Sequence, residues 1–402
     1  MTVNYDIIIV GAGPGGASAA RELSSYGLKV LVLEKTPLPR AKPCAGGLVF
    51  RGLDHVPRSV YQAIERYCYE TRVNILSCNL SLITKKPEPI LAMAMRENFD
   101  LALIKAAKST GARVLTSCKV IDLDFHPKHT KVITTNGGFT CRFVIGADGA
   151  LSITARRAGF GGPQDLVPAL GCELYLDRAQ FQRFNRAARF DIGFVPQGYG
   201  WVFPKEKHLS VGVGRLRKGP IDLKRLFDDY LRFLGIDRIQ GMKKKVSVIP
   251  LRPRTSTFVK NRVLLVGDAA GLADPLMAEG ISNAILSGQL AARAIRFGNF
   301  VEEKVKQCYE TLLDRKILND LNWARKAARC IYDHPRVGAL FFRIYGERMC
   351  EGMMEVMSGK RSYRQILVNP LTYLRPFRLG GAFTHRSLVD KEEGFGYLLS
   401  SC

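Results

Sequence analysis

The beginning of the chain alternates between apolar runs and a glycine-rich segment. Tyr5–Val10 is dominated by β-branched residues, which is typical of a parallel strand buried on both faces. Residues 11–16 contain four glycines, a helical segment follows from about Gly15 to Tyr26, and residues 29–33 form a second apolar run that ends before Glu34. We therefore expect a strand, a glycine turn, a helix and a second strand, in that order.

The pattern from residue 35 onward predicts a loop followed by mixed elements. Residues 35–48 are rich in Pro and Gly and predict a loop that leads into a helix from about Gly47. Residues 50–80 are expected to be mostly helical, and residues 79–83 alternate like the start of a strand in a second sheet. Apolar residues at helical spacing predict an amphipathic helix over 96–109.

Several later apolar runs are expected to return to the first sheet. Residues 111–116 predict such a strand, and residues 118–120 are expected on its neighbour. Residues 141–146 and 261–266 predict two more strands, each followed at once by a Gly/Asp turn. The small residues that follow Pro275 predict a helix through Ala294.

The spacing of apolar residues differs between the middle and the end of the chain. Between residues 168 and 250 short alternating runs predict a β-rich unit, with strands over 169–176, 190–195, 200–204 and 209–214. Residues 301–357 have an amphipathic helical pattern, and their Phe and Met residues suit either a core or a lipid groove. The last forty residues, with Pro370, Pro376 and Gly380-Gly381, are expected to be loop-like and able to cover a tunnel mouth.

The glycine turn has the spacing of a dinucleotide-binding motif. Gly11 allows the tight turn, Gly13 lets the backbone approach a pyrophosphate, and Gly16 lets the helix pack close to the strand. The phosphates would then lie at the helix N-terminus. Glu34 can accept hydrogen bonds from ribose hydroxyls and repels a 2′-phosphate, so its position favours FAD or NAD over NADP.

Two other features carry candidate chemistry. Cys44 is either a small hydrophobe in a turn or a thiol at a helix N-terminus that is available for proton transfer. Tyr199, Trp201 and Phe203 alternate and therefore share one face of a strand. Such aromatic stripes usually belong to a core, but here we favour a flat apolar wall of a cavity.

Size, charge and cysteine spacing bound the class of protein. The chain has 402 residues, of which 47% are hydrophobic, enough for large cores in two domains. The formal charge of +24 favours polyanions, an anionic bilayer surface or a phosphorylated substrate, although a solvated basic face is an equally good explanation of the dense run between residues 205 and 262. The ten cysteines show no zinc or iron–sulfur spacing, so no metal is expected. Without an apolar leader or membrane span, we expect a cytoplasmic protein.

Four motifs together resemble the geranylgeranyl reductase family of flavoproteins. They are the turn at 11–16, Pro43-Cys44-Ala45-Gly46-Gly47, the aromatic segment 199–204 and Gly267-Asp268. The resemblance covers residues 1 to about 300 and implies an α/β fold: a Rossmann-type FAD-binding domain, an inserted antiparallel β-sheet substrate domain and a helical C-terminal region. The FAD-binding domain would comprise residues 1–78, 96–160 and 255–300, the β-rich substrate domain 79–95 and 161–254, and the C-terminal region 301–402.

The same resemblance implies which residues hold FAD and substrate. Cys44, Tyr199 and Trp201 would be catalytic, and Tyr199, Trp201 and Phe203 would contact the substrate. The FAD-binding set would be Gly11, Gly13, Pro14, Gly15, Gly16, Glu34, Lys35, Cys44, Ala45, Gly47, Arg96, Val120, Asp148, Gly149, Asp268, Pro275, Gly280 and Ile281.

The expected function is an FAD-dependent reductase that saturates isolated C=C bonds of a geranylgeranyl or other polyprenyl chain. Reduced flavin would give hydride to one alkene carbon, and a proton source near Cys44 would supply the other hydrogen. The electron donor would be ferredoxin or NAD(P)H, with peripheral membrane contact and no nucleic acid partner. A flavin monooxygenase or halogenase on the same fold is the first alternative. The other is a basic membrane- or nucleic-acid-associated flavoprotein without catalysis.

Overall fold

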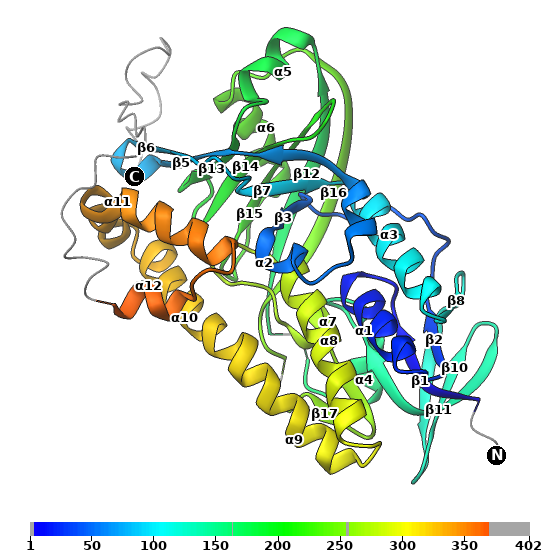
Figure 1. The fold of residues 1–402 in the computed structure, drawn as a ribbon. Helices are drawn as coiled ribbons and strands as arrows, with labels where there is room; N and C mark the ends of the chain where they lie inside the picture. The colour runs from blue at the N-terminus through cyan, green and yellow to red at the C-terminus, as the bar shows by residue number, and fades with distance from the viewer. Residues whose placement is uncertain (1–3, 163, 255–256, 370–402) are drawn as a thin grey trace.

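Two large sheets organise the computed structural model, which describes residues 4–162, 164–254 and 257–369 (Figure 1). The first sheet has the order β17-β18-β11-β1-β2-β8, with β10 paired to β11 and β9 paired to β10. Its central strand β1 (Tyr5–Val10) pairs in parallel with β2 (Val30–Leu33) and β11 (Gly137–Gly146). The first strand, the glycine turn and the second strand are therefore confirmed.

The outer strands of this sheet are short. They are β8 (Arg113–Leu115) beside β2, β18 (Val263–Leu265) beside β11, β17 (Val259–Lys260), and the β9 (Val120–Phe125) and β10 (Thr130–Thr134) pair. The expectation that residues 118–120 lie beside the strand at 111–116 is wrong, because β9 pairs with β10. A short antiparallel connection satisfies the backbone of β9 locally and draws it away from β8.

Helices α1 (Pro14–Ser25), α3 (Arg96–Ser109) and α8 (Ile281–Phe297) lie together beside the first sheet (Figure 1). The two short helices α4 (Ile153–Arg157) and α7 (Gly267–Ala270) follow β11 and β18. Glycine explains how closely α1 and α8 pack, because a Cβ at Gly288 would lie 2.2 Å from the Gly15 carbonyl oxygen. The predicted helix over 96–109 is confirmed.

The second sheet has seven strands in the order β16-β12-β15-β14-β13-β5-β6. Its members are β12 (Gln164–Leu176), β13 (Ala188–Ile192), β14 (Gly198–Pro204), β15 (Leu209–Arg215), β16 (Ile239–Arg252), β5 (Glu70–Ile75) and β6 (Leu80–Lys85). All neighbours are antiparallel except β13 and β5. Helices α5 (Arg178–Phe184) and α6 (Leu223–Phe233) contact this sheet, and α6 contributes Phe227 and Tyr230 to its core. The predicted β-rich unit is confirmed.

Residues 47–80 depart from the predicted helices. The chain forms β3 (Gly47–Val49), only one turn of helix in α2 (Phe50–Leu53), a 3-10 helix (Arg58–Ala63), β4 (Ile64–Cys68), β5 and a short 3-10 helix (Leu76–Cys78). Strands β3, β4 and β7 (Leu91–Ala94) make a third, three-stranded sheet. The helical expectation is wrong because these residues pair with strands distant in the sequence, and such pairing overrides local propensity. The strand expected from residue 79 is confirmed as β6.

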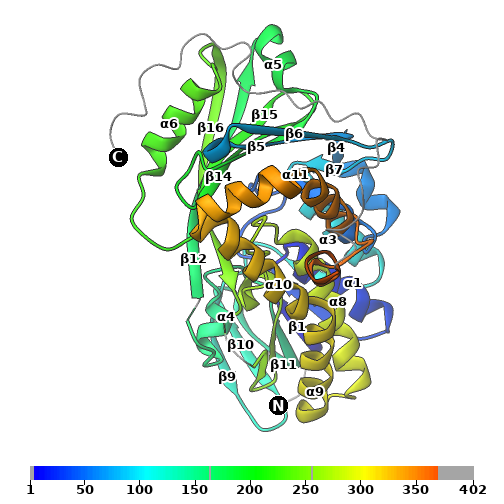
Figure 2. The same ribbon diagram turned by 90° about the vertical axis from the view of Figure 1, so that its left-hand side faces the viewer.

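The C-terminal part is helical, as expected, and packs against both units (Figure 2). It contains α9 (Glu302–Leu313), α10 (Asn319–Ala328), α11 (Pro335–Met357) and α12 (Tyr363–Val368), with π-helical turns at Asp314–Leu318 and Arg329–Asp333. Phe342, Met349, Met354 and Met357 are buried in the core that includes Trp201. The predicted loop with Pro370, Pro376 and Gly380-Gly381 lies outside the described residues. Among the described residues no helix is long and apolar enough to cross a bilayer.

Candidate active site

One cavity of about 620 Å³, called the site cavity below, opens between the first sheet and the inner face of the second sheet. One side is lined by the turns after β1, β11 and β18 and by the start of α8. The other side is lined by β12, β13, β14 and β16. The cavity thus brings together segments from residue 13 to residue 357, and most of the residues expected to hold FAD and substrate line it.

The glycine turn has the geometry that a pyrophosphate needs. A Cβ at Gly16 would lie 2.0 Å from the Gly11 carbonyl oxygen, and a Cβ at Gly11 would lie 2.4 Å from the Ala147 oxygen. A Cβ at Gly13 would meet nothing closer than Arg40, at 3.6 Å. No side chain caps the N-terminus of α1. Gly11 and Gly16 therefore shape the turn, and Gly13 exposes backbone to the cavity.

Glu34 belongs to a buried ion network beside this turn. Its carboxylate accepts a hydrogen bond from the Ala12 amide at 3.0 Å and contacts Arg40 Nε at 3.2 Å. Arg40 also contacts Asp100, and Arg96 forms a bidentate pair with Asp100 at 2.8 Å for both bonds. Burial opposes the charge of Arg96, but Asp100 and then Cys44 raise its pKa overall. The network holds Arg96, which lines the cavity, in the charged state.

Cys44 lies in this electropositive surrounding. Its Sγ accepts a hydrogen bond from the Gly46 amide at 3.4 Å, and its interaction with Arg96 helps to raise the pKa of that guanidinium. Beneath the same loop the fully buried Lys205 donates to the carbonyl oxygens of Gly46 and Ala94 at 3.1 and 3.0 Å. Burial lowers the pKa of Lys205, while Glu173 and Cys44 act in the opposite direction. The exposed thiol therefore lies between Arg96 and the loop that Lys205 holds.

The two Gly/Asp turns lie side by side at the cavity. Asp148 accepts hydrogen bonds from the Ser152 hydroxyl and from the Thr154 amide at 3.0 Å, so it orders the backbone after Gly149. Asp268 pairs with Lys42 at 3.8 Å. The buried Arg254 joins the two turns by donating to Ala150 O at 2.9 Å and to Ala269 O at 3.0 Å.

The opposite wall is aromatic. Tyr199, Trp201 and Phe203 of β14 line the cavity. The ring of Phe190, on β13, packs beside them, with its centroid 6.0 Å from that of Tyr199 and 5.2 Å from that of Phe203. The Trp201 ring lies on a floor without side chains, because a Cβ at Gly212 would be 2.2 Å from its Cζ2. The Tyr199 hydroxyl donates to the Met277 carbonyl at 2.6 Å, and burial raises its pKa. All three side chains of this wall are buried.

A few of the expected site residues do not line the cavity. Gly11, Gly16 and Glu34 lie behind the surface of the glycine turn, while Val120 and Pro275 are buried and do not line the cavity.

Sequence reasoning also missed residues that the structure places at the site. These are Arg40 and Asp100 of the ion network, Phe190 of the wall, and Lys205 and Glu173. Asp100 could have been found, because it stands four residues after Arg96 on one helix face.

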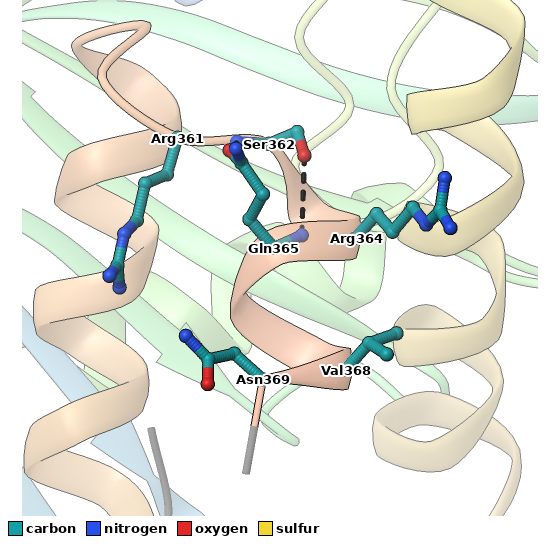
Figure 3. Close-up of a pocket in the computed structure, with 6 residues that line it drawn as sticks. All are labelled: Arg361, Ser362, Arg364, Gln365, Val368 and Asn369. Atoms are coloured by element: carbon teal, nitrogen blue, oxygen red, sulfur yellow. Dashed lines mark hydrogen bonds between the residues drawn. The ribbon is translucent and has the colours of Figure 1, made fainter. Parts of the chain in front are cut away.

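A second hollow lies beside α12 and contains none of the expected site residues (Figure 3). It is lined by Arg361, Ser362, Arg364, Gln365, Val368 and Asn369. The hydrogen bond from the Gln365 amide to Ser362 Oγ, 3.2 Å long, is the N-cap of α12 (Figure 3). Among the described residues no group of three or more His, Cys, Asp or Glu side chains is placed to hold a metal ion. The candidate chemistry therefore lies in the site cavity.

The site cavity fits FAD. The open backbone at Gly13 and the uncapped N-terminus of α1 suit the pyrophosphate, and Glu34 stands beside the same turn. At the other end the helix start at Gly280 has no side-chain cap, and Gly280 and Ile281 line the cavity. Backbone donors there suit the ring of a reduced, anionic flavin. The assignment of individual residues to FAD stays a prediction.

Comparisons with known proteins agree with this geometry. Residues 4–294 match the family described as FAD binding domain, so the cofactor is FAD. The chain is 30% identical to the geranylgeranyl diphosphate reductase of Oryza sativa subsp. japonica over 77% of this chain and 71% of the relative. It is 32% identical to the digeranylgeranylglycerophospholipid reductase of Methanosphaerula palustris over 73% of this chain and 76% of the relative.

Solved structures share the fold. A geranylgeranyl bacteriochlorophyll reductase-like protein from Thermoplasma acidophilum superposes with a TM-score of 0.73 at 25% identity, covering 84% of this chain and 90% of that protein. A variant of halogenase PltM in complex with FAD has a TM-score of 0.66 at 17% identity, covering 92% of this chain and 86% of that protein. The second likeness shows the fold alone.

Proposed function

The chain belongs to the geranylgeranyl reductase family of FAD-dependent oxidoreductases, and on that premise we propose that it hydrogenates isolated C=C bonds of a polyprenyl chain. The observation that carries the proposal is the aromatic wall opposite the FAD-binding turns. Tyr199, Trp201 and Phe203 offer a flat apolar surface to a substrate chain, and Met277 and Met357 line the same cavity. An isoprenoid chain presents only apolar surface to such a wall.

Positioning and exclusion of water are what the chain itself contributes. An isolated alkene has no carbonyl group to stabilise developing charge, so the protein must hold the double bond in place in a dry cavity. Trp201 and Phe203 lie so close to Gly212 and Gly47 that a Cβ at either glycine would come within 2.2 or 2.9 Å of the ring, so the position of the wall depends on these two glycines. Bound FAD, once reduced, supplies the hydride.

Cys44 is the proposed source of the proton. It lines the cavity at the foot of the loop that carries Gly46 and Gly47. When the thiol gives up its proton, the Gly46 amide and the Arg96 guanidinium can stabilise the thiolate. Lys205 keeps that loop in place from below. The Tyr199 hydroxyl is engaged with Met277, so Tyr199 acts as wall rather than as first proton donor.

Partners are proposed on the same basis. The relatives named above are reductases of a geranylgeranyl diphosphate and of a digeranylgeranylglycerophospholipid. A polyprenyl lipid or diphosphate is the proposed substrate here, and ferredoxin or NAD(P)H the proposed electron donor. The excess positive charge of +24 supports peripheral contact with an anionic membrane surface.

Product analysis tests the proposed reaction. Photoreduced holoprotein is incubated with geranylgeranyl diphosphate under nitrogen, and the molecular mass of the product is measured by mass spectrometry. The proposal predicts a gain of mass in steps of two hydrogens. A product that gains oxygen or halogen, formed only when air or halide is added, would instead support a monooxygenase or halogenase. No product under any of these conditions would support a flavoprotein without catalysis.

A further inference from the structure

The loop formed by residues 274–280 precedes α8, and residues 277–280 of it line the site cavity. Two backbone hydrogen bonds close this loop, from the Asp274 amide to the Glu279 carbonyl and from the Ala278 amide to the Asp274 carbonyl, each 2.8 Å long. Ala278 has a φ of 55°, a left-handed conformation that is unfavourable for a residue with a Cβ. Contacts elsewhere must therefore stabilise the closed shape.

The side chain of Asp274 holds the loop from within. It is fully buried, and its Oδ1 accepts hydrogen bonds from the amides of Leu276 and Met277 at 2.9 and 3.1 Å. Its Oδ2 accepts a hydrogen bond from the Tyr363 hydroxyl at 2.9 Å and lies 3.3 Å from an Arg51 nitrogen. Both oxygens of the carboxylate are thus engaged. The placement of Tyr363 and Arg51 therefore controls the backbone of the loop through Asp274.

Tyr363 comes from α12, in a part of the chain where no site residue was expected. Its side chain is 2% exposed, and its backbone amide donates to the Asp320 carboxylate of α10 at 2.7 Å. The capping box of Ser362 begins α12 directly before it. Helix α12 also contacts α11. The C-terminal helices therefore deliver one hydroxyl group to a loop at the site cavity.

Arg51 connects the same cluster to the start of α8. Its guanidinium lies 3.3 Å from both Asp274 and Glu279 and 4.0 Å from Asp320. Burial alone would lower the pKa of Arg51, but Glu279 and Asp274 raise it overall, so the guanidinium stays charged. Glu279 in turn accepts a hydrogen bond from the Ser282 amide, in the first turn of α8, at 2.8 Å. The cluster thus joins the loop to the helix start that follows it.

Two more tyrosine hydroxyls hold the backbone of the loop. Tyr332, in the π-helical turn before α11, donates to the Leu276 carbonyl at 3.0 Å, and Tyr199 of the aromatic wall donates to the Met277 carbonyl at 2.6 Å. Both tyrosines are buried, as is Tyr363. A segment that only connected two helices would need no directed contacts from three parts of the chain. Such contacts are typical of backbone whose shape a binding site depends on.

We propose that Tyr363 is a positioning residue for FAD. Through Asp274 it holds the 274–280 loop in the shape that presents the backbone at Gly280 and Ile281 to the flavin ring, where these two residues are expected to lie. The C-terminal helices then contribute to cofactor binding without touching FAD. The inference uses FAD binding alone, so it goes beyond the proposed reaction and does not depend on it.

Four variants distinguish positioning from the packing of α12. Tyr363→Phe removes only the hydroxyl. Tyr230→Phe is the matched control, because Tyr230 is also fully buried and donates to a buried Asp191 that pairs with Arg189, but this cluster belongs to the second sheet and α6. Ala278→Gly removes the strain of the left-handed backbone, since glycine adopts a positive φ readily. The double variant Tyr363→Phe/Ala278→Gly tests whether this relief restores the loop.

Three measurements are made on each full-length holoprotein. The FAD dissociation constant is obtained from the flavin fluorescence that appears when the holoprotein is diluted. The absorption spectrum of bound flavin reports the surroundings of the ring. Urea unfolding with excess FAD, followed by circular dichroism, reports the stability of the fold.

The expected result separates FAD binding from stability. Tyr363→Phe should raise the FAD dissociation constant roughly 3- to 10-fold and shift the flavin absorption bands, because part of the lost hydrogen bond to a charged acceptor is passed on to the loop. Tyr230→Phe should lose a similar resistance to urea but keep the wild-type FAD affinity and spectrum. The double variant with Ala278→Gly should regain most of the FAD affinity. Tyr332→Phe, which removes a neighbouring hydroxyl from the same loop, should raise the constant about 2- to 5-fold.

The proposal would be overturned by wild-type FAD affinity and spectrum in Tyr363→Phe, or by an equal loss of FAD in Tyr230→Phe. Failure of Ala278→Gly to restore FAD affinity would also overturn it, because the hydroxyl would then not act through the loop. If Tyr363→Phe does not fold, wild-type FAD affinity in Tyr332→Phe decides against the proposal. The proposed reaction is judged separately: if FAD binding responds as expected but the wild type reduces no double bond, the positioning role stands and the reductase proposal fails.

Discussion

Replacing Gly212 by alanine should displace the wall of the cavity without touching FAD. The added Cβ would lie 2.2 Å from Trp201 Cζ2 and 2.4 Å from the Leu170 carbonyl oxygen, whereas ordinary contacts begin near 3.4 Å. The indole must therefore move by more than about 1 Å, since the carbonyl belongs to the sheet and is held by its ladder. A misplacement of about 1 Å can cost roughly 100-fold in rate. We expect such a loss in kcat/KM, with a loss of about 1–3 kcal/mol in stability.

Gly214→Ala is the matched control for this change. Gly214 stands two residues further on the same face of β15, and its Cβ would meet only ordinary contacts, 3.5 Å from the Ala169 Cβ and 3.8 Å from Trp201 Cζ3. FAD content, thermal unfolding and kcat/KM with geranylgeranyl diphosphate are measured for both variants. Gly171→Ala, with its Cβ 3.4 Å from Trp201 Cζ2, should fall between them. If Gly212→Ala reduced the substrate as fast as Gly214→Ala, the role given to the Trp201 position would be refuted.

Three further predictions concern single side chains. Arg96→Met leaves the buried Asp100 with Arg40 as its one cationic partner among the described residues and should lower the free energy of unfolding by about 3 kcal/mol, as read from urea titration; an unchanged midpoint would contradict it. Cys44→Ala should keep FAD but lower kcat by roughly 10²- to 10⁴-fold, and normal turnover would place the proton source elsewhere. Burial raises the pKa of the Cys68 thiol from 9.0 to about 11, so the protonated thiol is favoured in the folded state. Its contribution to the free energy of unfolding, about 3 kcal/mol at most, is present below pH 9 and is lost as pH rises towards 11. Cys68→Ala should flatten that part of the curve of unfolding free energy against pH, and an unchanged slope would contradict the assignment.

The sequence predicted best those parts of the fold in which local pattern and tertiary role agree. The buried β-branched run of β1, the glycine turn and the amphipathic helix α3 are set by neighbours within a few residues, and the structure has them where the pattern indicated. The alternation of Tyr199, Trp201 and Phe203 was also enough to place them on one face. The sequence could not show that Gly212 and Gly47 leave room for the Trp201 and Phe203 rings of this face. These contacts join residues that become neighbours only in the folded structure.

The residues between 47 and 80 show where local reasoning ends. β4 and β5 obtain their hydrogen bonds from β7, β6 and β13, and β13 lies more than a hundred residues away. No local signal shows that partner. The same limit applies to Lys205, since a lysine after a strand is expected in solvent, and its burial becomes visible only when the Gly46 and Ala94 carbonyls are in place. The division of the chain into an FAD-binding domain, a substrate domain and a C-terminal region stays a prediction.

The most direct test of the account is an anaerobic titration of photoreduced holoprotein with geranylgeranyl diphosphate, followed through the flavin absorption spectrum. If the alkene is the electron acceptor beneath the aromatic wall, the oxidised band returns without oxygen, in proportion to the double bonds reduced. A flavin that stays reduced until air is admitted, with the prenyl chain unchanged, would contradict the account.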